Sequence, residues 1–234
     1  MKKYIGTKQI EAEPMTMGEA YEKGLLQAGR VPNESEKAND GYHVKYQDGY
    51  ESWSPKNSFE NAYKVADTPL DRMLIEGSEL SDRLSKLKNF VLGNKFKELD
   101  SDTRAMLLAQ TGVMRNYQHL LNIRYTKMGT GNGGCNNLPF GIAISLLCAG
   151  FALRRSGWNG KGLFVIKQVP TRINSDIIPK MQSLPQSAKD LIMKGRKFIA
   201  YTSQCLIYNE NTGCADSWVP SISDVFAEDW EIVG

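Results

Sequence analysis

The chain has 234 residues, of which 41% are hydrophobic and 24% are charged, as in an ordinary globular protein. Its formal net charge of +3 is too small to indicate nucleic acid or a membrane surface as a partner. No apolar run reaches the ~20 residues that span a bilayer, and no apolar segment follows Lys2 and Lys3 as it would in a signal peptide. We therefore expect the protein to stay in the cytoplasm where it is made.

Metal and cofactor chemistry finds little support in the sequence. A zinc site needs paired ligands at short spacing, and the two histidines, His43 and His119, supply no such pair. We expect no metal, no cofactor and free thiols in a reducing compartment. The cysteines are widely spaced and form no CxxC pair: Cys135, Cys148, Cys205 and Cys214.

Residues 1–66 are predicted to form a small α+β module. A short strand is expected over residues 7–13, followed by a helix that Thr16 caps and that ends near Gly29. Further on, Asp48-Gly49 lies between two segments of alternating character, which is the strongest short-range signal for a β-hairpin.

Aromatic residues gather in and after this hairpin, where Ser54-Pro55 is predicted to begin a short helix. In so small a module they favour a core of their own, and a binding platform is the alternative. The aromatic residues are Tyr42, Tyr46, Tyr50, Trp53, Phe59 and Tyr63.

Residues 67–128 are predicted to form a helical hairpin. Apolar residues recur at heptad spacing from Leu70 to Val91, and a second helix follows the break at Gly93-Asn94, with Ser101 or Asp102 as its cap. We expect antiparallel packing and surplus apolar surface that covers another domain or a second copy of the chain. The expected stripe of the second helix is Met106, Gln110, Val113, Tyr117 and Leu120, with Leu107, Met114 and Leu121 beside it.

The Gly- and Asn-rich residues 129–137 are interpreted as a linker, because they follow a helix and lack the GK[ST] ending of a phosphate-binding loop. Residues 138–234 then predict an α+β domain with an antiparallel sheet. Its expected elements are a helix over 139–150, strands over 151–155, 163–169, 198–201, 204–208 and 229–233, short helices within 177–194, and a short helix capped by Ser221.

Residues 155–162, Arg-Ser-Gly-Trp-Asn-Gly-Lys-Gly, are the most distinctive stretch of this domain. Three glycines in eight positions indicate sharp turns, and Trp158 between them offers a flat ring face with amide and cationic donors around it. This composition suits a small-molecule pocket, and it also suits a strained hairpin held by a buried tryptophan.

Nucleophilic catalysis is poorly supported, because the C-terminal domain contains no histidine with which to build a Ser-His-Asp or Cys-His arrangement. Paired carboxylates are present at Asp224, Glu228 and Asp229, but Asp224 is better explained as the capping-box partner of Ser221. The remaining tryptophans, cationic side chains and amides form an inventory suited to binding.

Three segments carry a resemblance to a known family. Pro139-Phe140-Gly141 opens a helix, the turn at 155–162 follows, and the chain then runs from Trp218-Val219-Pro220-Ser221 to Asp229-Trp230. In this order, over about residues 138–234, they resemble the type 2 Thoeris anti-defence family of phage proteins. The preceding residues are absent from compact members, and the N-terminal region resembles gut-phage modules without an assigned role.

The resemblance implies a non-enzymatic sponge that sequesters glycocyclic ADP-ribose, the signal of a bacterial TIR-domain enzyme, in the host bacterial cytoplasm. Some members also hold cyclic dinucleotides of the CBASS type. Members assemble as oligomers, commonly tetramers, with pockets between subunits. With the binding inventory, the expected ligand-binding residues are Phe140, Gly141, Arg155, Trp158, Asn159, Gly160, Lys161, Thr202, Trp218, Ser221, Asp224, Ala227, Asp229 and Trp230.

Two alternatives stay open at this point. One is an enzyme that processes a nucleotide or sugar, with Asp224 or Asp229 as general base. The other is an adaptor for host takeover, in which the aromatic surfaces and the helical hairpin bind a host protein.

Overall fold

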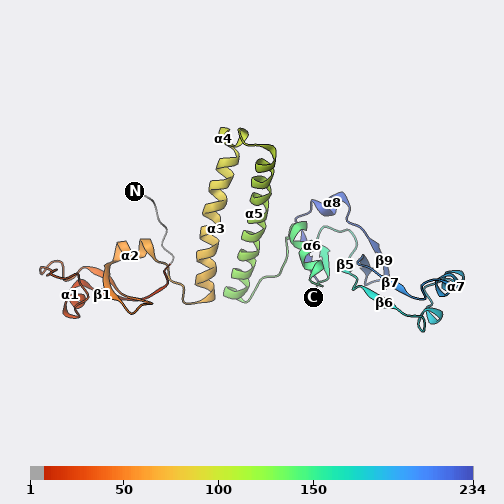
Figure 1. Ribbon diagram of the computed structural model, residues 1–234, viewed down its shortest axis with the longest axis horizontal. Coiled ribbons are helices and arrows are strands. Elements are labelled where there is room, and N and C mark those ends of the chain that lie inside the picture. The colour runs from red at the N-terminus through yellow and green to blue at the C-terminus, as the bar shows by residue number, and fades with distance from the viewer. Residues whose placement is uncertain (1–7, 234) are drawn as a thin grey trace. The chain divides into compact units, whose positions relative to one another are not determined.

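The computed structural model of the protein describes residues 8–233, and its helices and antiparallel sheets confirm the expected α+β class (Figure 1). The chain divides into two compact units, with the break between Ile75 and Glu76. Among the described residues, no helix combines the length and the apolar character needed to cross a membrane.

The first unit pairs its strands in chain order in one antiparallel sheet. Its elements are β1 (Ile10–Thr16), α1 (Met17–Glu22), β2 (Asp40–Tyr46), β3 (Glu51–Pro55) and α2 (Lys56–Ala62). The β2–β3 hairpin turns at the predicted place, and Gly49 has the left-handed φ of 84° that its turn requires. The predicted strand over 7–13 is displaced, since β1 begins at Ile10; Thr7 lies outside the described residues.

The helix expected to end near Gly29 is shorter than predicted. Thr16 caps α1 in a reciprocal capping box with Glu19, as its sequence suggests. The helix stops because Gly24 takes a left-handed φ of 71°, and the amide of Leu25 donates back to the carbonyl of Ala20 at 2.9 Å. This is a Schellman ending, and it occurs five residues before Gly29.

The aromatic residues of this unit pack on one another. The rings of Tyr42 and Phe59 are stacked with centroids 4.2 Å apart, and the ring of Tyr63 lies 5.0 Å from that of Phe59. The indole N–H of Trp53 donates to the carbonyl of Met15 at 2.9 Å. These contacts favour a small core over a binding platform. Pro55 itself is the N-cap of α2, one residue later than predicted.

Two long helices lie antiparallel and side by side, joined by a short connection (Figure 1). They are α3 (Pro69–Val91) and α5 (Ser101–Thr130), with the short α4 (Asn94–Lys97) between them. The cap of α5 is Asp100, whose carboxylate accepts from the amide of Thr103 at 2.9 Å, so neither Ser101 nor Asp102 has the predicted role.

The inward face of α5 agrees only in part with the predicted one. Thr111 and Leu121 are buried, whereas Met106 and Val113 of the predicted stripe are 64% and 68% exposed. Both stripes have heptad spacing, so the spacing alone does not distinguish them. Thr111 satisfies its hydroxyl by donating to the carbonyl of Leu107 at 2.9 Å, which lets this polar residue face inward.

The C-terminal domain contains one larger and one smaller antiparallel sheet. Its elements are α6 (Phe140–Cys148), β4 (Leu153–Arg155), β5 (Leu163–Lys167), β6 (Thr171–Ile173), η1 (Ile178–Lys180), α7 (Gln186–Lys194), β7 (Ile199–Tyr201), β8 (Cys205–Asn209), β9 (Cys214–Trp218), α8 (Ile222–Val225) and β10 (Trp230–Ile232). The larger sheet has the order β10-β4-β5-β8-β9, and β6 pairs with β7. Strands β6 and β9 were not predicted, since one has three residues and the other is mostly exposed.

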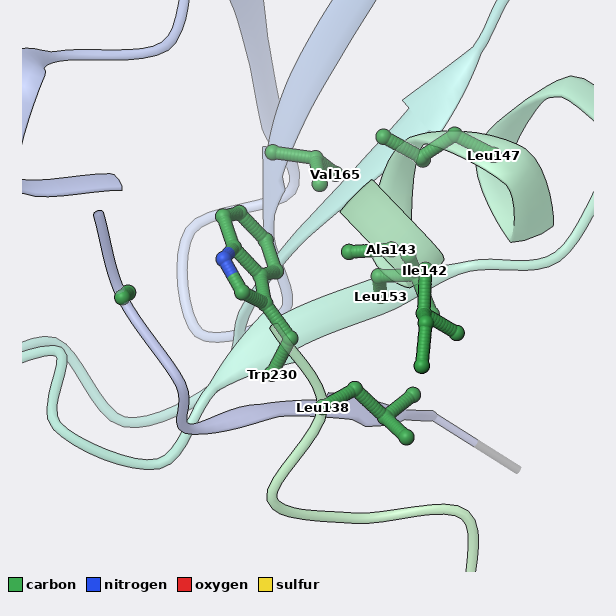
Figure 2. Close-up of a cluster of buried hydrophobic side chains, with 8 residues drawn as sticks. Leu138, Ile142, Ala143, Leu147, Leu153, Val165 and Trp230 are labelled. Atoms are coloured by element: carbon green, nitrogen blue, oxygen red, sulfur yellow. The ribbon is translucent and has the colours of Figure 1, made fainter. Parts of the chain in front are cut away.

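The core of this domain is built around Trp230, whose side chain has no exposed surface (Figure 2). The backbone of Trp230 exchanges two hydrogen bonds with that of Leu138, at 2.9 and 3.1 Å. The start of the domain is therefore fixed against its last strand. The cluster comprises Leu138, Ile142, Ala143, Leu147, Leu153, Val165, Ala227 and Trp230.

Candidate ligand-binding site

Arg155 is the centre of a charged network at the edge of the larger sheet. It lies on β4 directly opposite Trp230 of β10, which brings its guanidinium beside the turns before β10. Its Nη1 donates to Oδ1 of Asp224 at 2.9 Å, and its Nε donates to Oδ1 of Asp229 at 2.8 Å. The Arg155 side chain is only 16% exposed, so these are shielded, charge-assisted bonds.

Asp224 connects this network to the Trp158 turn. Its Oδ1 also accepts from the indole N–H of Trp158 at 3.0 Å, while its Oδ2 accepts from the amide and hydroxyl of Ser221 at 2.9 and 2.7 Å. The predicted capping box at the start of α8 is therefore confirmed. One carboxylate thus holds the tryptophan ring and starts a helix at the same time.

Gly157 allows the turn to approach Asp229 closely. Its amide donates to Oδ2 of Asp229 at 2.9 Å, and a Cβ added at Gly157 would lie 2.5 Å from the same oxygen. No other residue fits there without displacing the carboxylate. The Arg155–Gly157 part of the turn is consequently fixed to the segment before β10.

The environment of both carboxylates keeps them ionised. Burial alone would raise the pKa of Asp224, but hydrogen bonds from Trp158, Ser221 and Arg155 outweigh it and lower the pKa to about 2. The hydrogen bonds of Arg155 lower the pKa of Asp229 as well, and the same pairing raises the pKa of the Arg155 guanidinium.

A loss of stability in acid follows from these shifts. Because the pKa of Asp224 is depressed from 3.8 to about 2 on folding, its contribution is complete above about pH 5 and disappears as the pH falls through 2. We expect the free energy of unfolding to fall by roughly 2 kcal/mol over that range on account of Asp224 alone. Denaturant titrations between pH 7 and 2 measure the loss, and Asp224→Asn should flatten the profile.

Aromatic rings surround Trp230 on three sides. The ring centroids of Trp158, Phe140 and Trp218 lie 5.5, 5.8 and 6.0 Å from that of Trp230. The structure thus brings the three segments of the sequence motif to one place. Trp230 itself, which the sequence analysis placed among the ligand contacts, is fully buried and contacts the other rings from within the core. Ala227 is buried in the same core.

The other predicted residues lie at the surface. Asn159, Gly160 and Lys161 form an exposed tip of the Trp158 turn, and Thr202 is exposed between β7 and β8. Among the described residues, no hydrogen bond joins Thr202 to the Arg155 network. Gly141 is exposed at the first turn of α6.

Two residues that hydrogen-bond to the candidate site were not predicted. The carbonyl of Ser223 accepts from Arg155 Nη1 at 3.2 Å, and the side-chain amide of Asn211 donates to the carbonyl of Lys161 at 2.6 Å. A backbone acceptor leaves no mark in a sequence. Asn211, however, stands in the predicted turn before Gly213, and asparagine in such turns commonly bonds to nearby backbone.

Open hollows of about 300 and 360 Å³ lie in the first unit, and Asp40 and Lys56 line both of them. None of the expected ligand-binding residues takes part in either hollow. These hollows are therefore separate from the charged network and the aromatic rings of the C-terminal domain.

Comparison with known proteins agrees with this geometry. The model of the Thoeris anti-defence 2-like domain matches residues 138–233, which contain the larger sheet, the Arg155 network and the aromatic cluster. A second model, that of the Sequestin family, matches residues 67–127, the region of the helical hairpin.

A known relative also matches part of the chain. The protein Thoeris anti-defence 2 of Bacillus phage SP01 is 31% identical over 101 residues, which cover 41% of this chain and 94% of the relative. The chain belongs to the Thoeris anti-defence 2 family. The resemblance inferred from the three sequence segments is thereby confirmed.

Proposed function

We propose that this protein binds and sequesters glycocyclic ADP-ribose, the Thoeris signal, in the host bacterial cytoplasm and does not degrade it. The observation that carries the proposal is the use of Asp224 and Asp229: both carboxylates hold the Trp158 turn in place through Arg155 and Gly157. Family membership supports the anti-defence role. Cyclic dinucleotides of the CBASS type are the second ligand class to be tested.

The same contacts disfavour an enzyme with Asp224 as general base. An effective general base has a pKa near the working pH, whereas the pKa of Asp224 is about 2 and both of its oxygens already accept hydrogen bonds. Asp229 is likewise engaged by Arg155 and by the amide of Gly157. A proton taken by either carboxylate would weaken the network that positions the turn.

The parts of the turn that stay free suit a phosphorylated nucleotide. Trp158 is half-buried and offers a ring face for a base, while exposed Lys161 and Asn159 supply a positive charge and an amide for phosphates. Stacking on an aromatic ring contributes about 1–3 kcal/mol, and a hydrogen bond to a charged group contributes about 1.5–3 kcal/mol. Several such contacts together approach the ~12 kcal/mol of nanomolar affinity.

Calorimetry with glycocyclic ADP-ribose tests the proposal, followed by heating of the complex and analysis of the released ligand. Sequestration predicts tight binding and release of chemically intact ligand. Recovery of an altered ligand would favour the enzyme alternative, and absence of binding to either ligand class would remove the sponge function.

We also propose that the chain assembles as a tetramer through two separate apolar patches. The exposed α5 stripe consists of Met106, Val113 and Tyr117, whose hydroxyl also donates to Glu76 of α3, and the α8 patch consists of Val219, Ile222, Val225 and Phe226. Large side chains exposed in groups are typical of interaction surfaces. Two different two-fold interfaces are what a tetramer with dihedral symmetry requires.

A charged substitution in either apolar patch is expected to dissociate the tetramer into dimers. Val113 is 68% exposed and Phe226 is 81% exposed, so glutamate at either position should leave the fold of the chain intact. Val113→Glu and Phe226→Glu should each give dimers, and the double variant should give monomers, in sedimentation equilibrium. Leu191→Glu, on an exposed position of α7, is the matched control. A wild-type monomer would contradict the assembly.

A further inference from the structure

Helix α5 has a second packing face, which is directed at the C-terminal domain. Leu120 and Ile123 pack against the core cluster that contains Trp230. Asn116 and His119 precede them at a spacing of three to four residues, which places all four on one side of the helix. The buried Thr111 and Leu121 belong to the neighbouring inward stripe. One helix therefore serves both the hairpin and the candidate site.

Asn116 reaches the beginning of α6 on this face. Its amide nitrogen lies 3.1 Å from the position that a Cβ would occupy at Gly141. Gly141 stands next to Phe140, whose ring centroid is 5.8 Å from that of Trp230, and the ring centroid of Trp158 lies 5.5 Å from that of Trp230. The Asn116 amide therefore lies beside the first turn of α6, next to Phe140.

The polar side chains of this face, Asn116 and His119, lack hydrogen-bond partners within the described part of the chain. Among the described residues, the half-buried Asn116 amide has no hydrogen bond within the protein, and Nε2 of His119 is buried without a partner. A buried atom such as Nε2 of His119 is normally satisfied by protein, water or ligand, because an unpaired buried polar atom is costly, whereas the Asn116 amide is open to solvent and free to meet a ligand. A nucleotide bound over Phe140 and Gly141 would supply acceptors for the Asn116 amide.

We propose that Asn116 of α5 is a specificity-determining residue of the C-terminal site, where its amide donates to a polar group of the bound cyclic nucleotide. The proposal rests on the sequestration function proposed above. The relative from phage SP01 is matched over 94% of its length, which leaves only a few residues beyond the match and no room for a helical hairpin. The α5 contact is thus an addition to the compact form of the domain.

The test compares affinities for glycocyclic ADP-ribose by calorimetry on the full chain. Asn116→Asp keeps the shape but replaces the donor by a negative charge, and Asn116→Ala removes both donor and shape. We expect at least about tenfold weaker binding for Asn116→Asp, and a smaller loss for Asn116→Ala, with unchanged melting temperatures of the free proteins. Asn122→Ala, at an exposed position of α5, is the control.

The outcomes separate this inference from the function on which it rests. A wild-type protein that binds no cyclic nucleotide overturns both. A wild-type protein that binds, with Asn116→Asp binding equally well, overturns the role of Asn116 and leaves sequestration standing. Full-strength binding by Asn116→Ala would also overturn it, because that variant lacks the amide donor.

Discussion

The Asp224→Asn variant is expected to lose ligand binding and roughly 3 kcal/mol of folding stability. This is a larger effect than the one expected for Trp158→Ala. The substitution leaves the Arg155 guanidinium with one carboxylate instead of two and removes one acceptor of the bonds from Trp158 and Ser221. Both side chains are shielded, with 16% and 9% exposure for Arg155 and Asp224, so removal of one partner leaves a poorly solvated charge. Denaturant unfolding and calorimetry measure the two losses.

The neighbouring ion pair provides the matched control. Arg154 and Glu231 pair at 2.6 Å across β4 and β10, but the Arg154 side chain is 46% exposed. Glu231→Gln should therefore cost less than about 1 kcal/mol and leave binding unchanged. An Asp224→Asn protein that binds ligand at full strength but no longer converts it would support the enzyme alternative instead.

Trp158→Ala is expected to weaken ligand binding by about tenfold to a hundredfold, the range that corresponds to loss of one base-stacking contact. The ring also packs against the core cluster, so stability should fall by about 2 kcal/mol, less than for a fully buried tryptophan. Calorimetry at a temperature well below the melting point of the variant separates the two effects.

Trp158→Phe distinguishes the ring from its N–H group. Phenylalanine keeps an aromatic face but cannot donate to Asp224, which the indole does at 3.0 Å. We expect affinity between those of the wild type and the alanine variant. Should Trp158→Ala fold and bind like the wild type, the turn would have to be interpreted as a hairpin held by a tryptophan.

Local chemistry made much of the fold predictable. The Asp48-Gly49 turn, the helix cap at Thr16 and the capping box at Ser221 each depend on residues a few positions apart, and each occurs as expected. The same is true of the heptad stripe on α3, which needs only the spacing of its apolar side chains.

Features that depend on distant partners were harder to predict. Trp230 is among the ligand contacts expected from the sequence. In the fold, core residues of α6, β4 and β5 pack around its side chain and bury it completely (Figure 2). Likewise, the spacing of α5 fits two stripes, and only packing against α3 selects the one with Thr111 and Leu121. The Arg155 network joins residues about seventy positions apart, which no local pattern encodes.

The two parts of the Trp158 turn differ in how well they should tolerate substitution: the stem, Arg155 and Gly157, is constrained, and the tip, Asn159 and Lys161, is exposed. Arg155 and Gly157 are constrained by Asp229 and Asp224, so substitutions there disturb the fold. Asn159 and Lys161 project from the tip with exposed side chains, and changes at these positions carry little folding cost. If the protein sequesters a signal molecule as proposed, substitutions at the tip would alter ligand contacts while the stem keeps its fold.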